Sequence, residues 1–132
     1  TLVAAARHGG VETTGQLAAL VRRSVPHRGF SRIDPATRTF QALRIWVNRE
    51  LDGLDQFLEQ AIGRLRAGAR LAVIAFHSLE DRIVKHTFRA LAQREPALVR
   101  LMTRKPVVPG EAELAINRRA RSAKLRAVER LA

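Results

Sequence analysis

The sequence contains no cysteine and few aromatic residues, which make up 5% of its 132 residues. Without cysteine there can be no disulfide and no thiolate metal site, and the chain fits a reducing compartment. Apolar runs are also short: none approaches the roughly 20 residues that a membrane-spanning helix needs, and the N-terminus lacks a signal pattern. We therefore expect a cytoplasmic protein without a membrane partner, whose core is built mainly from Leu, Ile, Val and Ala.

Charge is the strongest compositional signal. The chain has 24 Lys and Arg against 12 Asp and Glu, a formal net charge of +12. Such a surplus attracts polyanions, and it favours nucleic acid as a partner. The length suffices for one small domain, or for pieces of two domains from a longer parent.

The N-terminal region is helical in character and begins abruptly. Thr1 opens a helix-like stretch that has neither a methionine nor a cap before it, so we expect the chain to be part of a longer protein. Further on, Thr13 or Thr14 is a good N-cap for a short helix that Pro26 would end.

A long periodic run follows Asp34 and Pro35, which together make a strong helix start. Apolar residues then recur every three or four positions: Phe40, Leu43, Val47, Leu51, Leu54, Leu58, Ile62 and Leu65. This spacing predicts one helix of about eight turns with a single stripe facing a core. Gly53 and Gly63 are expected to bend this helix, and Gly68 to form its C-cap.

A buried strand is expected next. Leu71–Phe76 is apolar without helical periodicity, as in a strand buried on both faces inside a parallel sheet. Ser78 and Asp81 have the spacing of a capping box ahead of an amphipathic helix. The apolar positions of this helix are Ile83, Val84, Phe88 and Leu91. Helix, strand and helix in succession predict an α/β fold of the doubly wound type.

The C-terminal third gives weaker signals. Residues 98–108 are compatible with a strand, and residues 111–116 with a short acidic helix. Leu125–Leu131 fits helical spacing but also has the length of an edge strand, and periodicity alone leaves both interpretations open.

Candidate site residues lie directly after the expected strand, because ligands of open α/β sheets bind beyond the carboxyl ends of strands. These residues are His77, Ser78, Glu80 and Asp81. The alternative is structural: Ser78 and Asp81 would cap the helix, and acids in a first turn are favoured by the helix dipole. His77 has no capping role in that interpretation, although a histidine at a strand end is more often structural than catalytic.

Candidate nucleic-acid-binding residues form two groups. Five cations within nine residues can meet several phosphates: Arg118, Arg119, Arg121, Lys124 and Arg126. Three polar side chains share one face of the long helix: Arg38, Arg44 and Asn48. The alternatives are a solvated basic turn and an exposed helix face. No metal site is expected, because the four histidines lack the close spacing of zinc ligands.

Three strings make the sequence resemble a known family. They are Asp34–Asn48, Phe76–Lys85 and Arg119–Arg126. Together, and in this order, they are similar to the ribosomal RNA small subunit methyltransferase H family, also called MraW. Two small departures are Gly68-Ala69 in place of a Gly-Gly pair, and Arg118 in place of a proline.

The resemblance implies a Rossmann-like class I methyltransferase domain interrupted by an all-helical insertion. Residues 1–34 would end the insertion, and residues 35–132 would form the C-terminal half of the methyltransferase domain. Leu71–Phe76 would be a central parallel strand of that domain. Leu125–Leu131 would also be a strand.

The resemblance also implies an activity: methyl transfer from S-adenosylmethionine to the exocyclic amino nitrogen, N4, of a cytosine in 16S rRNA of the small ribosomal subunit. His77, Ser78, Glu80 or Asp81 would border the base pocket, and Phe76 or His77 would pack on the base. The cofactor's glycine-rich loop lies upstream in the family, so we assign no cofactor ligand here.

The chain alone is therefore expected to be inactive without the N-terminal half of the same protein, and the sequence leaves a homodimer of the parent open. Two other readings of the residues stay open: a non-catalytic basic RNA-binding module, and a structural fragment whose charge is incidental.

Overall fold

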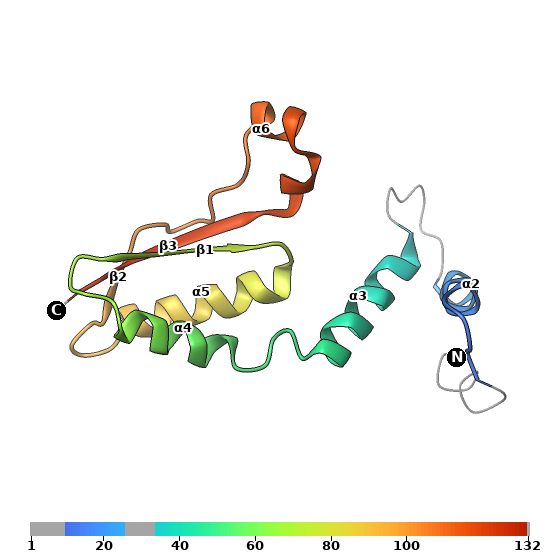
Figure 1. Cartoon of the computed structure of the whole chain (residues 1–132), viewed down its shortest axis with the longest axis horizontal. Coiled ribbons are helices and arrows are strands. Elements are labelled where there is room, and N and C mark those ends of the chain that lie inside the picture. The colour runs from blue at the N-terminus through green and yellow to red at the C-terminus, as the bar shows by residue number, and fades with distance from the viewer. Residues whose placement is uncertain (1–9, 26–33, 132) are drawn as a thin grey trace. The chain divides into compact units, whose positions relative to one another are not determined.

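The computed structural model describes residues 10–25 and 34–131 (Figure 1). It divides into two compact units, Thr1–Glu50 and Leu51–Ala132, which are described separately below. Among the described residues, no helix combines the length and apolar character needed to cross a membrane.

The first unit begins with helix α2 (Thr14–Ser24). Thr13 is its N-cap: the Thr13 hydroxyl accepts from the Gln16 amide, and the Gln16 side chain accepts from the Thr13 amide. This reciprocal capping confirms Thr13, one of the two N-caps that the sequence allowed, as the start of the helix. Val21 is the buried residue of the helix, and Pro26 lies outside the described residues.

Helix α3 (Pro35–Asn48) follows in the same unit and begins where the sequence predicts. Asp34 caps it, because one carboxylate oxygen accepts from the Ala36 amide at 2.9 Å. The other oxygen accepts from Arg22 of α2, so a single carboxylate both caps α3 and joins it to α2.

The predicted long helix is wrong, because the chain breaks after α3. Helix α4 (Leu54–Gly63) is a separate element of the second unit. Between the two helices, Arg49 and Gly53 adopt left-handed conformations, with φ of 52° and 70°. A left-handed residue ends the helical hydrogen-bond pattern, while the apolar spacing continues across the turn.

The expectation of one stripe facing one core is wrong for the same reason. Leu58 and Ile62 of α4 are buried, whereas Leu43 and Val47 of α3 are 41% and 68% exposed. Gly68 is left-handed as expected, with φ of 81°. It is not the C-cap of α4, however, but lies in the turn that leads into the sheet, where its amide donates to the Arg130 carbonyl.

The second unit contains a three-stranded sheet in the order β1-β3-β2 (Figure 1). The strands are β1 (Arg70–Ala75), β2 (Val99–Leu101) and β3 (Lys124–Arg130). The strand predicted over Leu71–Phe76 is confirmed except for Phe76, which follows its end. For Leu125–Leu131, the open choice between helix and strand is settled as strand β3.

The sheet contains no parallel neighbour of β1 among the described residues, and the other edge of β1, where such a neighbour was expected, is open there. Among the described residues its only strand neighbour is β3, which runs antiparallel, with Leu71 opposite Val128. Because β2 also runs antiparallel to β3, β1 and β2 point the same way with β3 between them. A periodicity argument cannot distinguish these directions, since both kinds of strand alternate their side chains with period two.

Only one face of β1 is covered, contrary to the expectation of a strand buried on both faces. Leu71 and Val73 pack against the core, whereas Ala72 is exposed and Ile74 is 54% exposed on the other face. On that outer face, Ala72 lies opposite Ala127, and Ile74 opposite Leu125.

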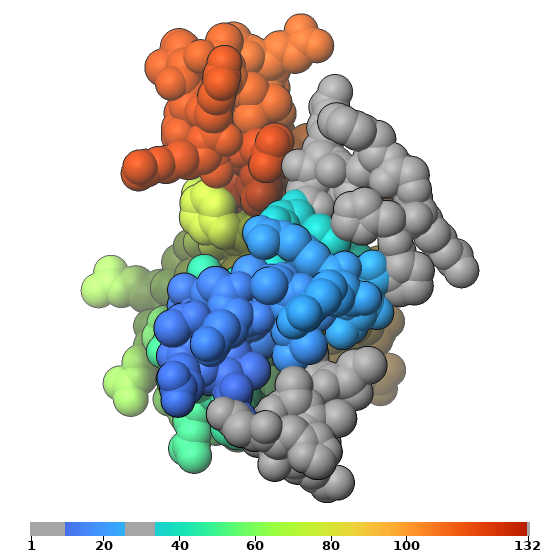
Figure 2. All heavy atoms as spheres, turned by 90° about the vertical axis from the view of Figure 1, so that its right-hand side faces the viewer, coloured from blue at the N-terminus to red at the C-terminus, as the bar shows by residue number. Residues whose placement is uncertain are grey.

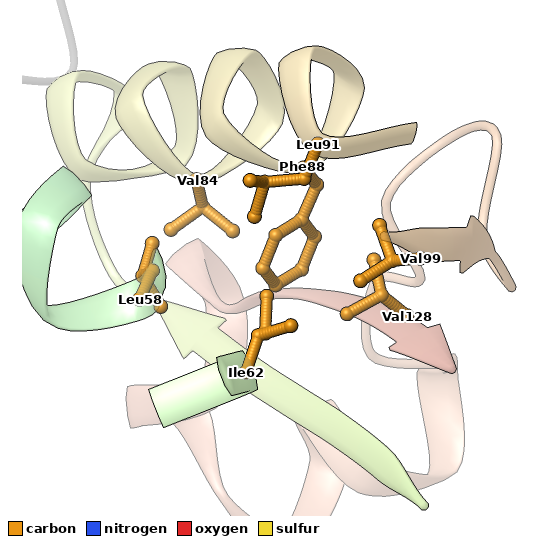
Figure 3. Packing of buried hydrophobic residues seen from close by; sticks show 7 residues of the cluster. All are labelled: Leu58, Ile62, Val84, Phe88, Leu91, Val99 and Val128. Atoms are coloured by element: carbon orange, nitrogen blue, oxygen red, sulfur yellow. The ribbon is translucent and has the colours of Figure 1, made fainter. Parts of the chain in front are cut away.

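Helix α5 (Ser78–Ala92) packs against all three strands, and α4 packs against α5. Their contact forms the core, in which Phe88 points from α5 toward Ile62 and the sheet (Figure 3). The fully buried members are Leu58, Ile62, Val84, Phe88, Leu91, Val99 and Val128. Truncating a ring such as Phe88 in a core of this kind typically costs about 3 to 5 kcal/mol.

A helical lobe joins β2 to β3. It consists of α6 (Glu111–Ile116), which confirms the expected acidic helix, and the 3-10 helix η1 (Arg118–Ser122). The lobe stands out from the sheet of the second unit (Figure 1), and Figure 2 shows its atoms in orange and red. The strand expected over residues 98–108 is confirmed only as β2 and a single bridge between Val107 and Leu125.

Candidate functional site

The four candidate residues lie in the segment of residues 76–81, called the turn after β1, which includes the first turn of α5. His77 is the N-cap of this helix. Its Nδ1 accepts from the Glu80 amide at 3.3 Å. In return, one Glu80 carboxylate oxygen accepts from the amides of His77 and Phe76, at 3.4 and 3.2 Å. The capping box predicted for Ser78 and Asp81 is therefore wrong, because the helix starts one residue earlier than that spacing requires.

His77 acts structurally through the unprotonated nitrogen of its ring. Since Nδ1 accepts a hydrogen bond, this nitrogen carries no proton in the cap. The side chain is 8% exposed, and Nε2 makes no hydrogen bond in the described part of the chain, although a Glu80 carboxylate oxygen lies 3.4 Å away. The ring thus faces the protein, and the statement that it has no capping role is wrong.

Asp81 is held by two cations of β3. Its carboxylate accepts from Arg126 through Nε at 2.7 Å and Nη2 at 3.2 Å, and Lys124 Nζ lies 3.6 Å away. Asp81 and Arg126 are 8% and 6% exposed. The Arg126 hydrogen bonds lower the pKa of Asp81 below its ordinary value, outweighing the opposing effect of burial. The ion pair between the Asp81 carboxylate and the Arg126 guanidinium therefore joins the first turn of α5 to β3.

Two side chains of this turn remain available to a ligand. Ser78 is exposed and makes no hydrogen bond in the described residues, and the Phe76 ring is 57% exposed at the end of β1. The carboxylates of Glu80 and Asp81 are engaged in the cap and the ion pair, and His77 is engaged in the cap through Nδ1 only. The arrangement is a fixed turn that presents one hydroxyl and one aromatic ring.

The C-terminal cation string is divided by the structure. Arg118, Arg119 and Arg121 are exposed on η1, whereas Lys124 is half-buried near Asp81 and Arg126 is buried. Sequence reasoning overlooked Asn117, whose side chain accepts from the Arg119 amide and caps η1. An asparagine before a helical turn is a recognisable capping signal.

Two of the three candidates on α3 contact Glu50, an acid that sequence reasoning also overlooked. Arg44 Nε lies 2.9 Å from a Glu50 carboxylate oxygen, and the Asn48 amide donates to the same oxygen at 3.1 Å. Arg38 is exposed on the same helix. Two of the three predicted members of the polar face are therefore tied to Glu50.

No group of three or more His, Asp or Glu side chains suitable for a metal ion occurs in the residues that the structure describes. Comparison with known families gives one match along nearly the whole chain: the model of the MraW methylase family matches residues 1–131. The chain belongs to the MraW methylase family.

Curated MraW relatives carry the name ribosomal RNA small subunit methyltransferase H. One from Cyanothece sp. is 54% identical over 95% of this chain, and one from Nitratidesulfovibrio vulgaris is 53% identical over 99%. A third, from Geobacter sulfurreducens, is 50% identical over 98% of the chain. The chain spans only 40%, 40% and 46% of these relatives, so it corresponds to part of an MraW protein.

Proposed function

We propose that the parent of this chain transfers a methyl group from S-adenosylmethionine to N4 of a cytosine in 16S rRNA, and that the turn after β1 borders its substrate site. The observation that carries the proposal is the exposure of Phe76 and Ser78 on an otherwise engaged turn. The names of the half-identical relatives support the reaction.

Rigidity of the turn supports a substrate-positioning role. The His77–Glu80 box fixes the backbone at the end of β1, and the Asp81–Arg126 pair fixes the next residues against β3. A group held in this way loses little freedom when it meets a substrate, which lowers the entropic part of a reaction barrier.

Phe76 and Ser78 would act on the base in different ways. The cytosine amine is a poor nucleophile, because its lone pair is delocalised into the ring. Phe76 would stack on the base, a contact typically worth about 1 to 3 kcal/mol. The Ser78 hydroxyl would accept a hydrogen bond from the amine as positive charge develops on the nitrogen.

The acidic residues of the turn after β1 fit S-adenosylmethionine poorly. A cofactor ribose is usually bound by a free carboxylate, but the Glu80 carboxylate accepts from backbone amides and that of Asp81 from Arg126. We therefore place the cofactor, which would supply the methyl group, with the remainder of the parent.

The exposed cations would contact RNA outside the pocket. The three arginines of η1 are exposed on the lobe, where their guanidinium groups would bind backbone phosphates. Arg38, Arg44, Asn48, Lys124 and Arg126 stay predictions as RNA-binding residues, and the ion pair of Arg126 favours a positioning role instead. An rRNA substrate would place the parent in the cytoplasm.

The assignment to parent domains is also part of the proposal. Residues 1–34 would end a helical insertion, and residues 35–132 would belong to a Rossmann-like domain. The outer edge of β1 and its exposed outer face support continuation of the sheet there. However, α3 lies in the same compact unit as α2, so contacts in this chain divide it after Glu50.

A second candidate function is a non-catalytic RNA-binding module, which the net charge of +12 favours. The experiment that separates the two uses the full-length parent with Phe76→Ala or Ser78→Ala, and with Leu79→Ala as a control in the same turn. Single-turnover methyl incorporation into 30S subunits is measured with labelled cofactor. We expect losses of about 10-fold or more for the first two variants, corresponding to at least about 1.4 kcal/mol.

The control should retain the wild-type rate, since Leu79 is exposed but offers no ring or hydroxyl. Circular dichroism verifies that all variants are folded. Wild-type rates in both Phe76→Ala and Ser78→Ala would refute the placement of the substrate site, and RNA binding by a parent that transfers no methyl group would support the second candidate.

A further inference from the structure

A small basic hollow lies in the second unit, where side chains of α5, of β3 and of the segment after β2 meet. Its wall includes four cations and one hydroxyl, from Lys85, Arg89, Thr103, Arg104 and Arg126. The open space is about 10 Å³, roughly the room that one water-sized group needs. A phosphate oxygen fits this space, whereas a nucleoside does not.

The cations converge because of how the elements pack. Lys85 and Arg89 are four residues apart on α5 and share one side of the helix, and Arg104 comes from the segment after β2. Like charges at this helical spacing repel each other. Their grouping is therefore unfavourable until an anion neutralises it.

No acidic side chain performs that neutralisation within the described residues. No ion pair there joins Lys85, Arg89 or Arg104 to a carboxylate. The carboxylate of Asp81 is already bonded to Arg126 and lies near Lys124. The hollow thus keeps a surplus of positive charge.

Thr103 adds a donor to the hollow. Its Oγ1 accepts from the Ala127 amide at 3.0 Å, which leaves the hydroxyl proton free to point elsewhere. Lysine and arginine side chains only donate hydrogen bonds. The free polar groups around the hollow are consequently donors, as a site for an anionic oxygen requires.

We propose that this hollow binds one backbone phosphate of the RNA substrate, through Lys85, Arg89, Arg104 and the Thr103 hydroxyl. The identity of the polyanion as RNA rests on the proposed function. Arg126 contributes as a fixed positive charge behind these groups, since Asp81 already orients its guanidinium. The site adds an RNA contact on α5 and after β2 to those on the η1 lobe.

The test measures how salt weakens binding of a fluorescein-labelled 16S rRNA transcript to the full-length parent. Each phosphate contact contributes about 0.7 to 0.9 to the slope of log affinity against log salt concentration. Arg89→Gln and Arg104→Gln should each reduce the slope measurably, by up to about this amount, and weaken binding several-fold at about 0.15 M salt. Arg104→Lys, which keeps the charge, should retain most of the slope.

Arg66→Gln is the matched control, because Arg66 is an exposed cation of the same unit that does not line the hollow. The proposal is overturned if the hollow variants keep the wild-type slope, or if Arg66→Gln loses as much. It is also overturned if Arg89→Gln and Arg104→Gln abolish binding to phosphatidylserine vesicles while RNA binding is unchanged.

Wild-type methyl transfer to 30S subunits is measured on the same preparations, so that the two proposals fail separately. A parent that methylates while the hollow variants keep their slopes disproves the phosphate site alone. A parent that does not methylate while the slopes fall disproves the proposed reaction and leaves the phosphate site standing.

Discussion

Arg126 ends the basic string that begins at Arg118, yet the structure gives it different surroundings from its neighbours in sequence. On β3, successive side chains alternate between the two faces of the sheet, and Arg126 lies on the core face with Val128. Arg118 lies on a 3-10 turn and is exposed. A count of cations cannot distinguish these environments, because it ignores the alternation that a strand imposes.

The Asp81–Arg126 pair gives a stability prediction at this scale. Asp81→Asn leaves the buried Arg126 guanidinium without its countercharge, which should reduce the free energy of unfolding by about 3 kcal/mol at pH 7. The measurement is equilibrium urea unfolding of the parent from pH 7 to pH 3. Since the folded pKa of Asp81 is lowered, its contribution is complete above the unfolded pKa of about 3.9 and is lost as pH falls through the folded value.

The difference between wild type and Asp81→Asn should therefore shrink toward pH 3. A double variant, Asp81→Leu with Arg126→Met, serves as the control, because replacing both charges leaves no unpaired ion and should cost less than the single change. A difference that is the same at pH 3 and pH 7 would contradict the account of this pair.

At the scale of elements, the sequence predicted where most helices and strands begin, but not how the strands pair or where the long helix breaks. The caps at Thr13 and Asp34 placed the starts of α2 and α3, and an apolar run without helical period placed β1. Strand direction was not predictable, because it depends on which strand becomes the neighbour. The break after α3 was missed because the apolar spacing continues through it.

The turn between α3 and α4 provides a test of whether left-handed residues separate these two helices. Gly53 has a φ of 70°, so Gly53→Ala should destabilise the parent by about 1 kcal/mol through left-handed strain. Gly63→Ala is the matched control: Gly63 is the last residue of α4, and an added Cβ would meet nothing within 4 Å. That change should stabilise the protein by up to about 1 kcal/mol.

Thermal unfolding midpoints of the two variants provide the comparison. Opposite shifts are expected, downward for Gly53→Ala and upward for Gly63→Ala. Equal upward shifts would mean that residue 53 can continue a helix, and would support the single long helix that the sequence predicted.

At the scale of the whole chain, the position of the candidate site could be predicted from the sequence, but the roles of its residues could not. The strand end at residue 76 was predictable, whereas the engagement of His77 and Asp81 depends on a cap geometry and on β3, far along the chain. The hollow was missed because its cations come from α5 and from the segment after β2, which no single motif joins.

The second unit also has an apolar outer sheet face that includes the half-exposed Ile74 opposite Leu125. We infer that the remainder of the parent covers this face, since this chain spans about 40% of its first relatives. The turn after β1 would then lie where this chain and the remainder meet.

We propose that this chain supplies part of a methyltransferase and needs the remainder of its parent to act. The most direct measurement compares transfer of labelled methyl groups to 30S subunits by the full-length parent and by residues 1–132 alone. We predict labelling at a cytosine N4 by the parent and none above background by the chain. Comparable labelling by the isolated chain, or none by the folded parent, would contradict the account.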